Sequence, residues 1–323
     1  MPCHRQGARG RGPDALLRAS DQRHPRFACH GSNPLNSGGR LGVKSRLVLR
    51  ACPGARPVAP LVREGGGAVD IAGLFSLQGR VALVTGASGV LGAHFARVLH
   101  GAGASVALAA RREAATAALA AELGARAVSV PLDVTAPESI APAFAAAEAA
   151  FGAPCDILVN NAGIAVTKPA LQQSAEDWDA VLDVNLRGCF LVAQEAAKRL
   201  VAAKRPGVVV NIASVLGERI IPGVVGYTAA KAGLLHMTRH LAVEWARHGI
   251  RVNAIAPGYI ATDINRDYFA SDSGQAMIKR IPQRRLGAAE DLTGPLLLLT
   301  SEAGVHMTGA VVTVDGGHSI NPL

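Results

Sequence analysis

Aromatic residues are scarce in this sequence, at 4% of 323 residues, although 49% of the residues are hydrophobic. Ala, Val and Leu must therefore do most of the packing, in a chain long enough to bury a substantial single core. Long hydrophobic runs are missing too, because no stretch approaches the roughly 18 apolar residues that span a bilayer. The runs at 106–110 and 296–299 are expected to be core strand or helix, and we expect no membrane partner.

Cysteines at paired short spacing are also absent, which disfavours both a zinc site and a disulfide framework. A reduced compartment is then the default, and we expect the protein to be cytoplasmic. The five cysteines are Cys3, Cys29, Cys52, Cys155 and Cys189. Cys189 lies in an apolar run and is expected to be a buried small hydrophobe rather than a nucleophile. His236, His240 and His248 share one predicted helix without an HExxH arrangement, so no metal is expected.

Excess charge is missing from most of the chain. The formal net charge is +9, but residues 1–68 hold twelve Lys and Arg against three Asp and Glu, and residues 69–323 hold 21 of each. The basic excess belongs wholly to the first segment. A neutral body lacks the basic surface that nucleic acid requires, so no nucleic-acid partner is expected.

The first segment, residues 1–69, is rich in Gly, Pro and Arg and lacks hydrophobic periodicity. Three interpretations stay open: a mitochondrial targeting segment, a disordered basic tail, or an artefact of an upstream start. Gly and Pro disfavour the long amphipathic helix of a targeting segment. No Met lies between Met1 and Met237, so an artefact would imply a non-Met start, with Val69 a candidate. We favour the artefact or a dispensable tail.

From Asp70 the pattern becomes regular, and residues 70–323 are expected to form a single domain. Short apolar segments predict strands at 80–84, 105–110, 127–131, 157–159, 208–213, 251–255 and 310–314. Longer amphipathic segments predict helices after the first strand as far as residue 102, and at 114–123, 137–151, 176–199, 226–247 and 289–299. This alternation predicts an α/β fold, a Rossmann-like doubly wound parallel sheet of about seven strands with helices on both faces.

Tyr227 and Lys231 stand four residues apart, one helical turn, on the same face of a predicted helix. An ammonium group stabilises a neighbouring phenolate, which suits the phenol to exchange a proton with an alcohol or ketone. The YxxxK pattern alone is weak evidence, because an ordinary helix surface often carries it. Ser214, in Asn-Ile-Ala-Ser-Val upstream, is a further polar candidate.

A glycine-rich turn follows the first strand, with the sequence Thr-Gly-Ala-Ser-Gly-Val-Leu-Gly at 85–92. Glycines at a strand-to-helix turn let the backbone approach a pyrophosphate at the helix N-terminus. Later motifs follow in order: Asp-Val at 133–134, Asn-Asn-Ala-Gly at 160–163, Val-Asn at 184–185, Pro-Gly at 257–258 with Thr262, and Val-Asp-Gly-Gly at 314–317. In this set and order, residues 74–317 strongly resemble the short-chain dehydrogenase/reductase family.

The resemblance implies roles at the matching positions. Tyr227 would be the general acid and base, Ser214 would hydrogen-bond the substrate oxygen, and Lys231 would stabilise the tyrosine and hold the nicotinamide ribose. Asn185 would support a proton relay from Lys231 to solvent. The cofactor-binding set that the resemblance implies is Gly86, Ser88, Gly89, Leu91, Gly92, Arg111, Asp133, Val134, Asn161, Ala162, Gly163, Tyr227, Lys231, Pro257, Gly258, Ile260 and Thr262. Within it, Asp133 and Val134 would touch the adenine, and Ile260 and Thr262 the carboxamide.

Two details concern the cofactor. The common family form, TGxxxGxG, would place Gly at Val90, whereas this chain has Gly89; we expect a slightly altered turn rather than lost binding.

The second strand ends without the Asp or Glu that usually binds the ribose of NAD, since Ala110 stands there and Arg111 follows. A guanidinium can bind a 2′-phosphate, so NADP(H) is favoured, with NAD(H) possible. The alternative interpretation of Arg112 is solvation at a helix start.

The sequence leaves the substrate open between 3-oxoacyl thioesters and sugars or polyols, the branch that the segments at 281–287 and 307–309 resemble. Residues 259–286 are expected to form an amphipathic, lid-like wall around a small-molecule site. An alternative is a non-catalytic NADP(H)-binding regulatory or scaffold protein on the same fold. The resemblance also implies a homodimer or homotetramer, formed through the helices at 176–199 and 226–247.

Overall fold

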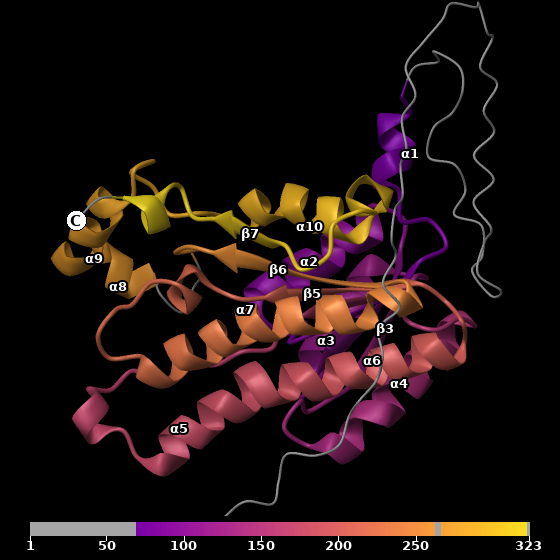
Figure 1. Ribbon diagram of the computed structural model, residues 1–323, viewed down its shortest axis with the longest axis horizontal. Coiled ribbons are helices and arrows are strands. Elements are labelled where there is room, and N and C mark those ends of the chain that lie inside the picture. The colour runs from indigo at the N-terminus through magenta and orange to yellow at the C-terminus, as the bar shows by residue number, and fades with distance from the viewer. Residues whose placement is uncertain (1–68, 262–265, 322–323) are drawn as a thin grey trace, which may run out of the picture. The chain divides into compact units, whose positions relative to one another are not determined.

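A computed structural model describes residues 69–261 and 266–321 (Figure 1). Its sheet has seven parallel strands in the order β3-β2-β1-β4-β5-β6-β7. The strands are β1 Val81–Thr85, β2 Ser105–Ala110, β3 Ala127–Pro131, β4 Ile157–Asn160, β5 Gly207–Ile212, β6 Ile250–Pro257 and β7 Val311–Val314. The order reverses between β1 and β4, which in such sheets is where ligands bind. The predicted doubly wound sheet of about seven strands is confirmed.

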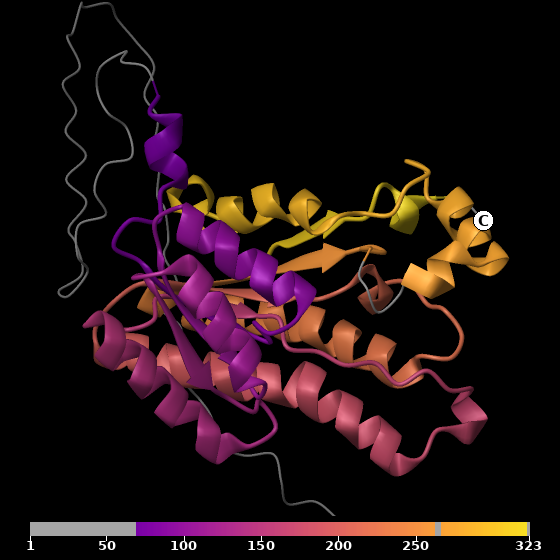
Figure 2. The same cartoon turned by 180° about the vertical axis from the view of Figure 1, so that it is seen from behind.

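Helices cover both faces of this sheet, because alternate side chains of each strand point to opposite sides. Leu83 packs in a core with α4, α6 and α7, whereas Val84 packs with α2, α3 and α10. In Figure 1 α6 and α7 lie in front of the sheet, and in the reverse view of Figure 2 the indigo helix α2 is in front. The helices are α1 Ile71–Phe75, α2 Val90–Gly101, α3 Glu113–Leu123, α4 Pro137–Phe151, α5 Ala175–Leu182, α6 Cys189–Ala202, α7 Val225–Trp245, α8 Arg266–Ala270, α9 Asp272–Arg280 and α10 Thr293–Thr300.

One predicted helix is interrupted. The sequence predicts a continuous helix at 176–199, but α5 and α6 are separated by a π-helical segment, Asp183–Gly188. The last residue of this segment, Gly188, packs closely against Val134, because a Cβ on Gly188 would lie 2.8 Å from the carbonyl oxygen of Val134. Single π turns inside α-helices are common at functional sites. This one carries Asn185, whose side chain is completely buried.

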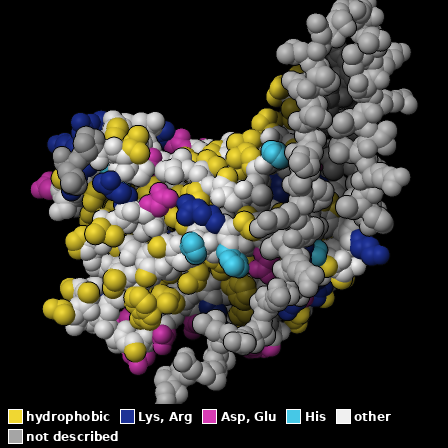
Figure 3. All heavy atoms as spheres, in the orientation of Figure 1, with side chains coloured by type: hydrophobic (Ala, Val, Ile, Leu, Met, Phe, Trp, Pro, Cys, Tyr) yellow, Lys and Arg dark blue, Asp and Glu magenta, His cyan; other side chains and the backbone are white. Residues whose placement is uncertain are grey.

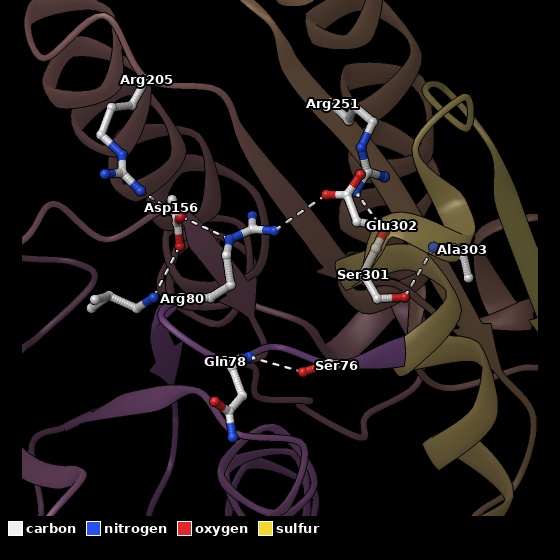
Figure 4. A network of polar contacts seen from close by, with 10 residues as sticks. Ser76, Gln78, Arg80, Asp156, Arg205, Arg251, Ser301, Glu302 and Ala303 are labelled. Carbon is white, nitrogen blue, oxygen red and sulfur yellow. Dashed lines mark hydrogen bonds and ion pairs between the residues drawn. The ribbon is translucent and has the colours of Figure 1, made fainter. Parts of the chain in front are cut away.

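A buried carboxylate joins the amino ends of the strands (Figure 4). Asp156 precedes β4 and is 3% exposed. Its Oδ1 accepts a hydrogen bond of 3.0 Å from the backbone of Val81, and its Oδ2 lies 2.7 Å from Arg80 Nε and 3.4 Å from Arg205 Nη2. The Arg80 guanidinium also lies 4.0 Å from Glu302. The network fixes the start of β1 against β4. It lies at the amino ends of the strands, opposite the predicted site at their carboxyl ends.

Replacing Asp156 by Asn should lower the free energy of unfolding by about 2 kcal/mol, the range for a lost charge-assisted hydrogen bond. The amide keeps the shape of the carboxylate but presents N–H groups where Arg80 needs an acceptor. Urea unfolding of the purified chain measures the change. Asp179→Asn on the exposed face of α5 is the matched control, with an expected change within about 0.5 kcal/mol. Equal effects of the two substitutions would contradict a structural role for the network.

The cysteine prediction holds within the described residues. Cys155 and Cys189 are both free and buried, and burial raises the pKa of Cys155 to about 12. Both thiols are therefore poor nucleophiles. Among the described residues, no helix is long and apolar enough to cross a membrane, and no His, Cys, Asp or Glu cluster suits a metal ion. The predictions for residues 1–68 lie outside the described part of the chain.

Candidate active site

The glycine-rich turn joins β1 to α2 at the point where the strand order reverses. Gly86 has a φ of +65°, a backbone conformation that favours glycine. A Cβ on Gly92 would lie 2.2 Å from the carbonyl oxygen of Gly86, so only glycine lets α2 pack onto the turn. The turn thus presents backbone and the first N–H groups of a twelve-residue helix, which is the environment a pyrophosphate requires.

The displaced glycine does not disturb this arrangement. Gly89 precedes α2 as its N-cap, with φ −96° and ψ 165°, and makes no side-chain cap. A Cβ there would come no closer than 3.5 Å to the oxygen of Gly86, an ordinary contact. Val90 occupies the first helical position, with 44% of its side chain exposed. The geometry agrees with the expectation of a usable turn.

The Asn-Asn-Ala-Gly segment braces the turn from β4. Asn161 donates from its side chain to the carbonyl oxygens of Thr85, at 3.0 Å, and Gly86, at 3.3 Å. The Thr85 hydroxyl accepts hydrogen bonds from the backbone of Asn161 and Ala162, at 3.0 and 3.1 Å. The amide of Asn161 is therefore engaged with the turn that the resemblance places next to the pyrophosphate.

The predicted adenosine end lies beyond β2 and β3. Asp133 accepts hydrogen bonds from the backbone and hydroxyl of Thr135, at 2.9 and 2.8 Å, and lies 3.8 Å from Arg111. Burial acts to raise the pKa of Asp133, but the Thr135 hydrogen bonds and the Arg111 charge outweigh it and hold that pKa below its usual value. The Arg111 side chain is 68% exposed and free to turn toward a ligand. Ala110 ends β2 without a carboxylate.

Arg112 is exposed at the start of α3, where it is the N-cap residue. Its guanidinium also donates to the Ser88 backbone oxygen at 2.8 Å and to the Ser88 hydroxyl at 3.2 Å. It therefore links the end of β2 to the phosphate turn. Only the tertiary arrangement brings these two segments together.

The tyrosine and lysine of the opening turns of α7 face one another. The Lys231 ammonium lies 5.6 Å from the centroid of the Tyr227 ring. Lys231 is only 4% exposed and donates to the carbonyl oxygen of Ile212, at the end of β5, at 2.8 Å. A buried ammonium has a fixed position once it is hydrogen-bonded. The predicted pair is thus brought together with the ammonium group buried and the phenol half-buried.

Ser214 and Asn185 approach the same place from other elements. Ser214 follows β5, is 7% exposed, and accepts from the backbone of Leu216 at 3.1 Å. The Asn185 side chain bonds both backbone groups of Ile164, accepting at 2.8 Å and donating at 2.7 Å. A Cβ on Gly163 would lie 3.2 Å from Asn185 Oδ1 and 3.8 Å from Lys231 Nζ, so this glycine separates the two polar groups.

A buried amide network beneath the site was missed by the sequence reasoning. Asn160 donates to the carbonyl of Cys189 at 2.9 Å and to the side chain of Asn211 at 3.0 Å. Asn211 donates in turn to Thr238 at 2.9 Å. The network joins β4, β5 and α7 to the residue directly after the π segment. The sequence does contain a sign of this network: asparagines occur inside otherwise apolar strands, and a buried amide side chain needs hydrogen-bond partners.

The predicted nicotinamide end follows β6. Pro257 closes the strand, and Gly258 donates to the backbone of Val314 at 2.9 Å. A Cβ on Gly258 would lie 2.7 Å from the Cβ of Asp315, so the two chain segments touch. Ile260 is buried and pairs with Gly287 in a short parallel bridge. Thr262 lies outside the described residues.

The fold and these side chains combine the features expected of an oxidoreductase site: a glycine-rich turn at the strand reversal, together with a tyrosine, a lysine and a serine. The model of the family described as enoyl-(acyl carrier protein) reductase matches residues 86–319. The chain belongs to the short-chain dehydrogenase/reductase family. The fold class and the general enzyme class predicted from the motifs are therefore confirmed.

Relatives of known name include members of two enzyme branches. The chain is 40% identical over 245 residues to 2-dehydro-3-deoxy-D-gluconate 5-dehydrogenase of Escherichia coli K12, covering 75% of this chain and 96% of the relative. It is 36% identical over 242 residues to the 3-oxoacyl-[acyl-carrier-protein] reductase of the same strain, covering 75% and 98%. A crystal structure of a putative 2-deoxy-D-gluconate 3-dehydrogenase from Agrobacterium tumefaciens with bound NADP is 44% identical, covering 76% and 98%, with a TM-score of 0.70.

Proposed function

We propose that this chain catalyses reversible, NADP(H)-dependent hydride transfer between the nicotinamide and a ketone or secondary alcohol. The observation that carries the proposal is the buried Lys231 ammonium 5.6 Å from the ring of Tyr227, beside the glycine cradle. The relatives' oxidoreductase names support it. Turnover of NADPH with a panel of ketones, and of NADP with the matching alcohols, tests it directly.

The chain's own residues would position the substrate and the cofactor and transfer the proton. Bound nicotinamide supplies or accepts the hydride. Tyr227 transfers the proton to or from the substrate oxygen, and Ser214 holds that oxygen by a hydrogen bond. Lys231 stabilises the phenolate; of its three N–H donors one is fixed on Ile212, which leaves donors for the ribose hydroxyls. Asn185, held on both groups of Ile164, would support the relay of that proton to solvent.

The cofactor would bind with its pyrophosphate over the turn formed by Gly86, Ser88, Gly89, Leu91 and Gly92. Two features of the structure fit it: the close packing of the start of α2 onto the turn at Gly92, and the uncapped start of α2. At the other end, the absence of an acid at Ala110 and the exposed guanidinium of Arg111 favour the 2′-phosphate of NADP. The NADP bound in the Agrobacterium relative supports the same preference.

Arg111→Ala should raise the KM for NADPH at least about tenfold and change the KM for NADH less than twofold, because only the former carries a 2′-phosphate for the guanidinium. Initial rates with each cofactor at saturating substrate measure this. Arg112→Ala is the comparison variant: it loosens the turn at Ser88 and should weaken both cofactors alike. Equal losses with both cofactors in Arg111→Ala would defeat the assignment.

The alternative of a non-catalytic scaffold is not favoured. Proteins that keep only the fold would not need the buried Lys231, Ser214 and Asn185 or the half-buried Tyr227 beside them, and the relatives are named for enzymes. Two substrate branches remain candidates, sugar or polyol derivatives and 3-oxoacyl thioesters, since relatives of both names match the chain closely.

We further propose that two or four copies associate through α5, α6 and α7. Exposed apolar side chains support this: Trp178 on α5 is 37% exposed, and Val225 and Val243 on α7 are 41% and 83% exposed. Figure 3 shows hydrophobic side chains gathered over the lower part of this face, where α5 lies in Figure 1. Light scattering of the purified chain measures the assembly. Cytoplasmic location stays a prediction.

A further inference from the structure

Three neighbouring strands deliver polar side chains to one end of the candidate site. β5, β6 and β7 are adjacent in the sheet. Ser214 follows β5, Tyr259 follows β6, and His318 follows β7 in a 3₁₀ turn, His318–Ile320. Arg219, five residues after Ser214, donates to the Ser319 backbone oxygen at 2.9 Å, so the loop after the predicted catalytic serine touches the turn that carries His318.

Tyr259 and His318 lie together at this end. Their ring centroids are 5.4 Å apart and the planes meet at 67°, an edge-to-face contact. Phe269 of α8 closes the other side of Tyr259, with centroids 5.6 Å apart. Asn321 ties the chain end to α9 through the Arg280 oxygen at 2.7 Å. Figure 1 shows α8, α9 and the chain end close together beyond the carboxyl ends of β6 and β7.

Two atoms of this pair have no hydrogen-bond partner. The Tyr259 hydroxyl and His318 Nδ1 are both shielded from solvent and unpaired. A buried polar atom without a partner is costly, so a group enclosed with it normally satisfies it. The neighbouring carboxylate of Asp315 does not serve, because it accepts from the backbone of Gly317 at 2.9 Å and of Ser319 at 2.6 Å.

The chemistry of the missing partner follows from the histidine. Burial, with the charges of Arg219 and Arg280, lowers the pKa of His318 more than Asp315 and a hydrogen bond to the Arg280 backbone raise it. Burial therefore favours the neutral ring, in which Nδ1 accepts or donates a hydrogen bond according to the tautomer. A hydroxyl group can pair with the ring in either tautomer and with the Tyr259 phenol, because a hydroxyl both donates and accepts. A ketone or thioester carbonyl only accepts, so it cannot satisfy the acceptor form of the ring.

We propose that Tyr259 and His318 form a hydroxyl-binding subsite, and that the substrate is a polyhydroxylated ketone or its alcohol, of the keto-sugar or polyol class. A substrate hydroxyl forms a hydrogen bond with His318 Nδ1, and the same or a neighbouring hydroxyl bonds the Tyr259 phenol. The exposed guanidinium groups of Arg219 and Arg280 favour members of this class that also carry a carboxylate. This inference rests on the proposed function.

The test compares substrates with and without extra hydroxyl groups, in the full-length purified chain with NADPH. A keto-sugar acid, a neutral keto-sugar, an unhydroxylated cyclic ketone and an acetoacetyl thioester form the panel. We expect the wild-type chain to favour the two hydroxylated ketones. Tyr259→Phe and His318→Phe should each raise the KM for these at least about tenfold, because a site built around a hydroxyl loses its partner. Both variants should leave kcat/KM for the cyclic ketone within about twofold.

Two further variants separate binding from structure. His318→Asn keeps an acceptor near Nδ1 and should lose less affinity for the keto-sugars than His318→Phe. His306→Phe, at an exposed histidine, is the control for the histidine substitution. Tyr259→Phe removes only an unpaired oxygen, so its Tm should not fall.

The outcomes distinguish the two proposals. Absence of turnover on the whole panel with either cofactor overturns the proposed function and the subsite with it. Turnover that favours the thioester or the cyclic ketone overturns the subsite alone. If neither variant changes the KM for the keto-sugars, the subsite is also overturned. The Tyr259 hydroxyl and His318 Nδ1 would then bind only a buried water. Equal losses on every substrate would also overturn the subsite, because they would mean that the two residues merely shape the fold.

Discussion

Replacing Tyr227 by Phe should lower kcat about a thousandfold, within the range that general acid–base catalysis contributes. The substitution removes one hydroxyl and leaves the ring 5.6 Å from the Lys231 ammonium. Lys231 keeps its hydrogen bond to Ile212, so the ribose-binding group stays in place. NADPH affinity should therefore change less than about threefold. The variant would thus lose transition-state stabilisation but keep cofactor binding.

Single-turnover oxidation of NADPH, together with fluorescence titration of the cofactor, measures the two quantities separately. His306→Phe, at an exposed histidine outside the candidate site, should keep the wild-type kcat. A Tyr227→Phe variant with full turnover on every active substrate would revive the alternative of a non-catalytic cofactor-binding protein. A variant that loses cofactor binding and turnover equally would place Tyr227 in binding rather than in proton transfer.

Replacing Gly92 by Ala should lower the free energy of unfolding by about 3 kcal/mol, the upper end for an overpacked site. The added Cβ would lie 2.2 Å from the Gly86 oxygen and 2.8 Å from the Ala87 Cα, and both are backbone atoms that cannot rotate away. The start of α2 must move away from the turn. The pyrophosphate would bind at this helix start, so the substitution would misplace the groups that bind it. NADPH affinity should therefore fall more than about a hundredfold.

Gly89→Ala is the matched control within the same turn. Its Cβ would come no closer than 3.5 Å to the Gly86 oxygen, and its φ of −96° suits any residue. Urea unfolding should show a change within about 1 kcal/mol, and in the stabilising direction. Equal destabilisation by the two substitutions would contradict the packing account of Gly92. Loss of NADPH affinity in Gly89→Ala without loss of stability would show that the displaced glycine approaches the cofactor closely.

The elements of the fold were largely predictable from the sequence. Near-continuous apolar strands such as β1 and β5 are buried on both faces, and this pattern is legible without tertiary information. The interruption at Asp183–Gly188 was not predictable in the same way. Residues 176–199 have the apolar spacing of one continuous helix, and the contact of Gly188 with Val134, a residue far away in the chain, is visible only in the folded structure.

The candidate site divides along the same line. Tyr227, Lys231, Ser214 and the glycine turn carry local signals, because their spacing and their place after predicted strands are sequence properties. The hydrogen bonds from Arg112 to Ser88 were not predictable, since nothing in a linear sequence shows that the two residues lie within reach of each other. The pairing of Tyr259 with His318 was likewise invisible, because the two residues follow different strands and meet only where β6 and β7 end side by side.

The sequence by itself determined the class of the fold, the order of its motifs and the chemistry that those motifs serve. These properties follow from periodicity and residue type, which act over a few residues. The tertiary structure alone decided the π segment at Asn185, the bracing of the phosphate turn by Asn161 and Arg112, and the unpaired atoms of Tyr259 and His318. Each of these depends on contacts between strands or loops that are distant in the chain, and such contacts exist only once the sheet has assembled.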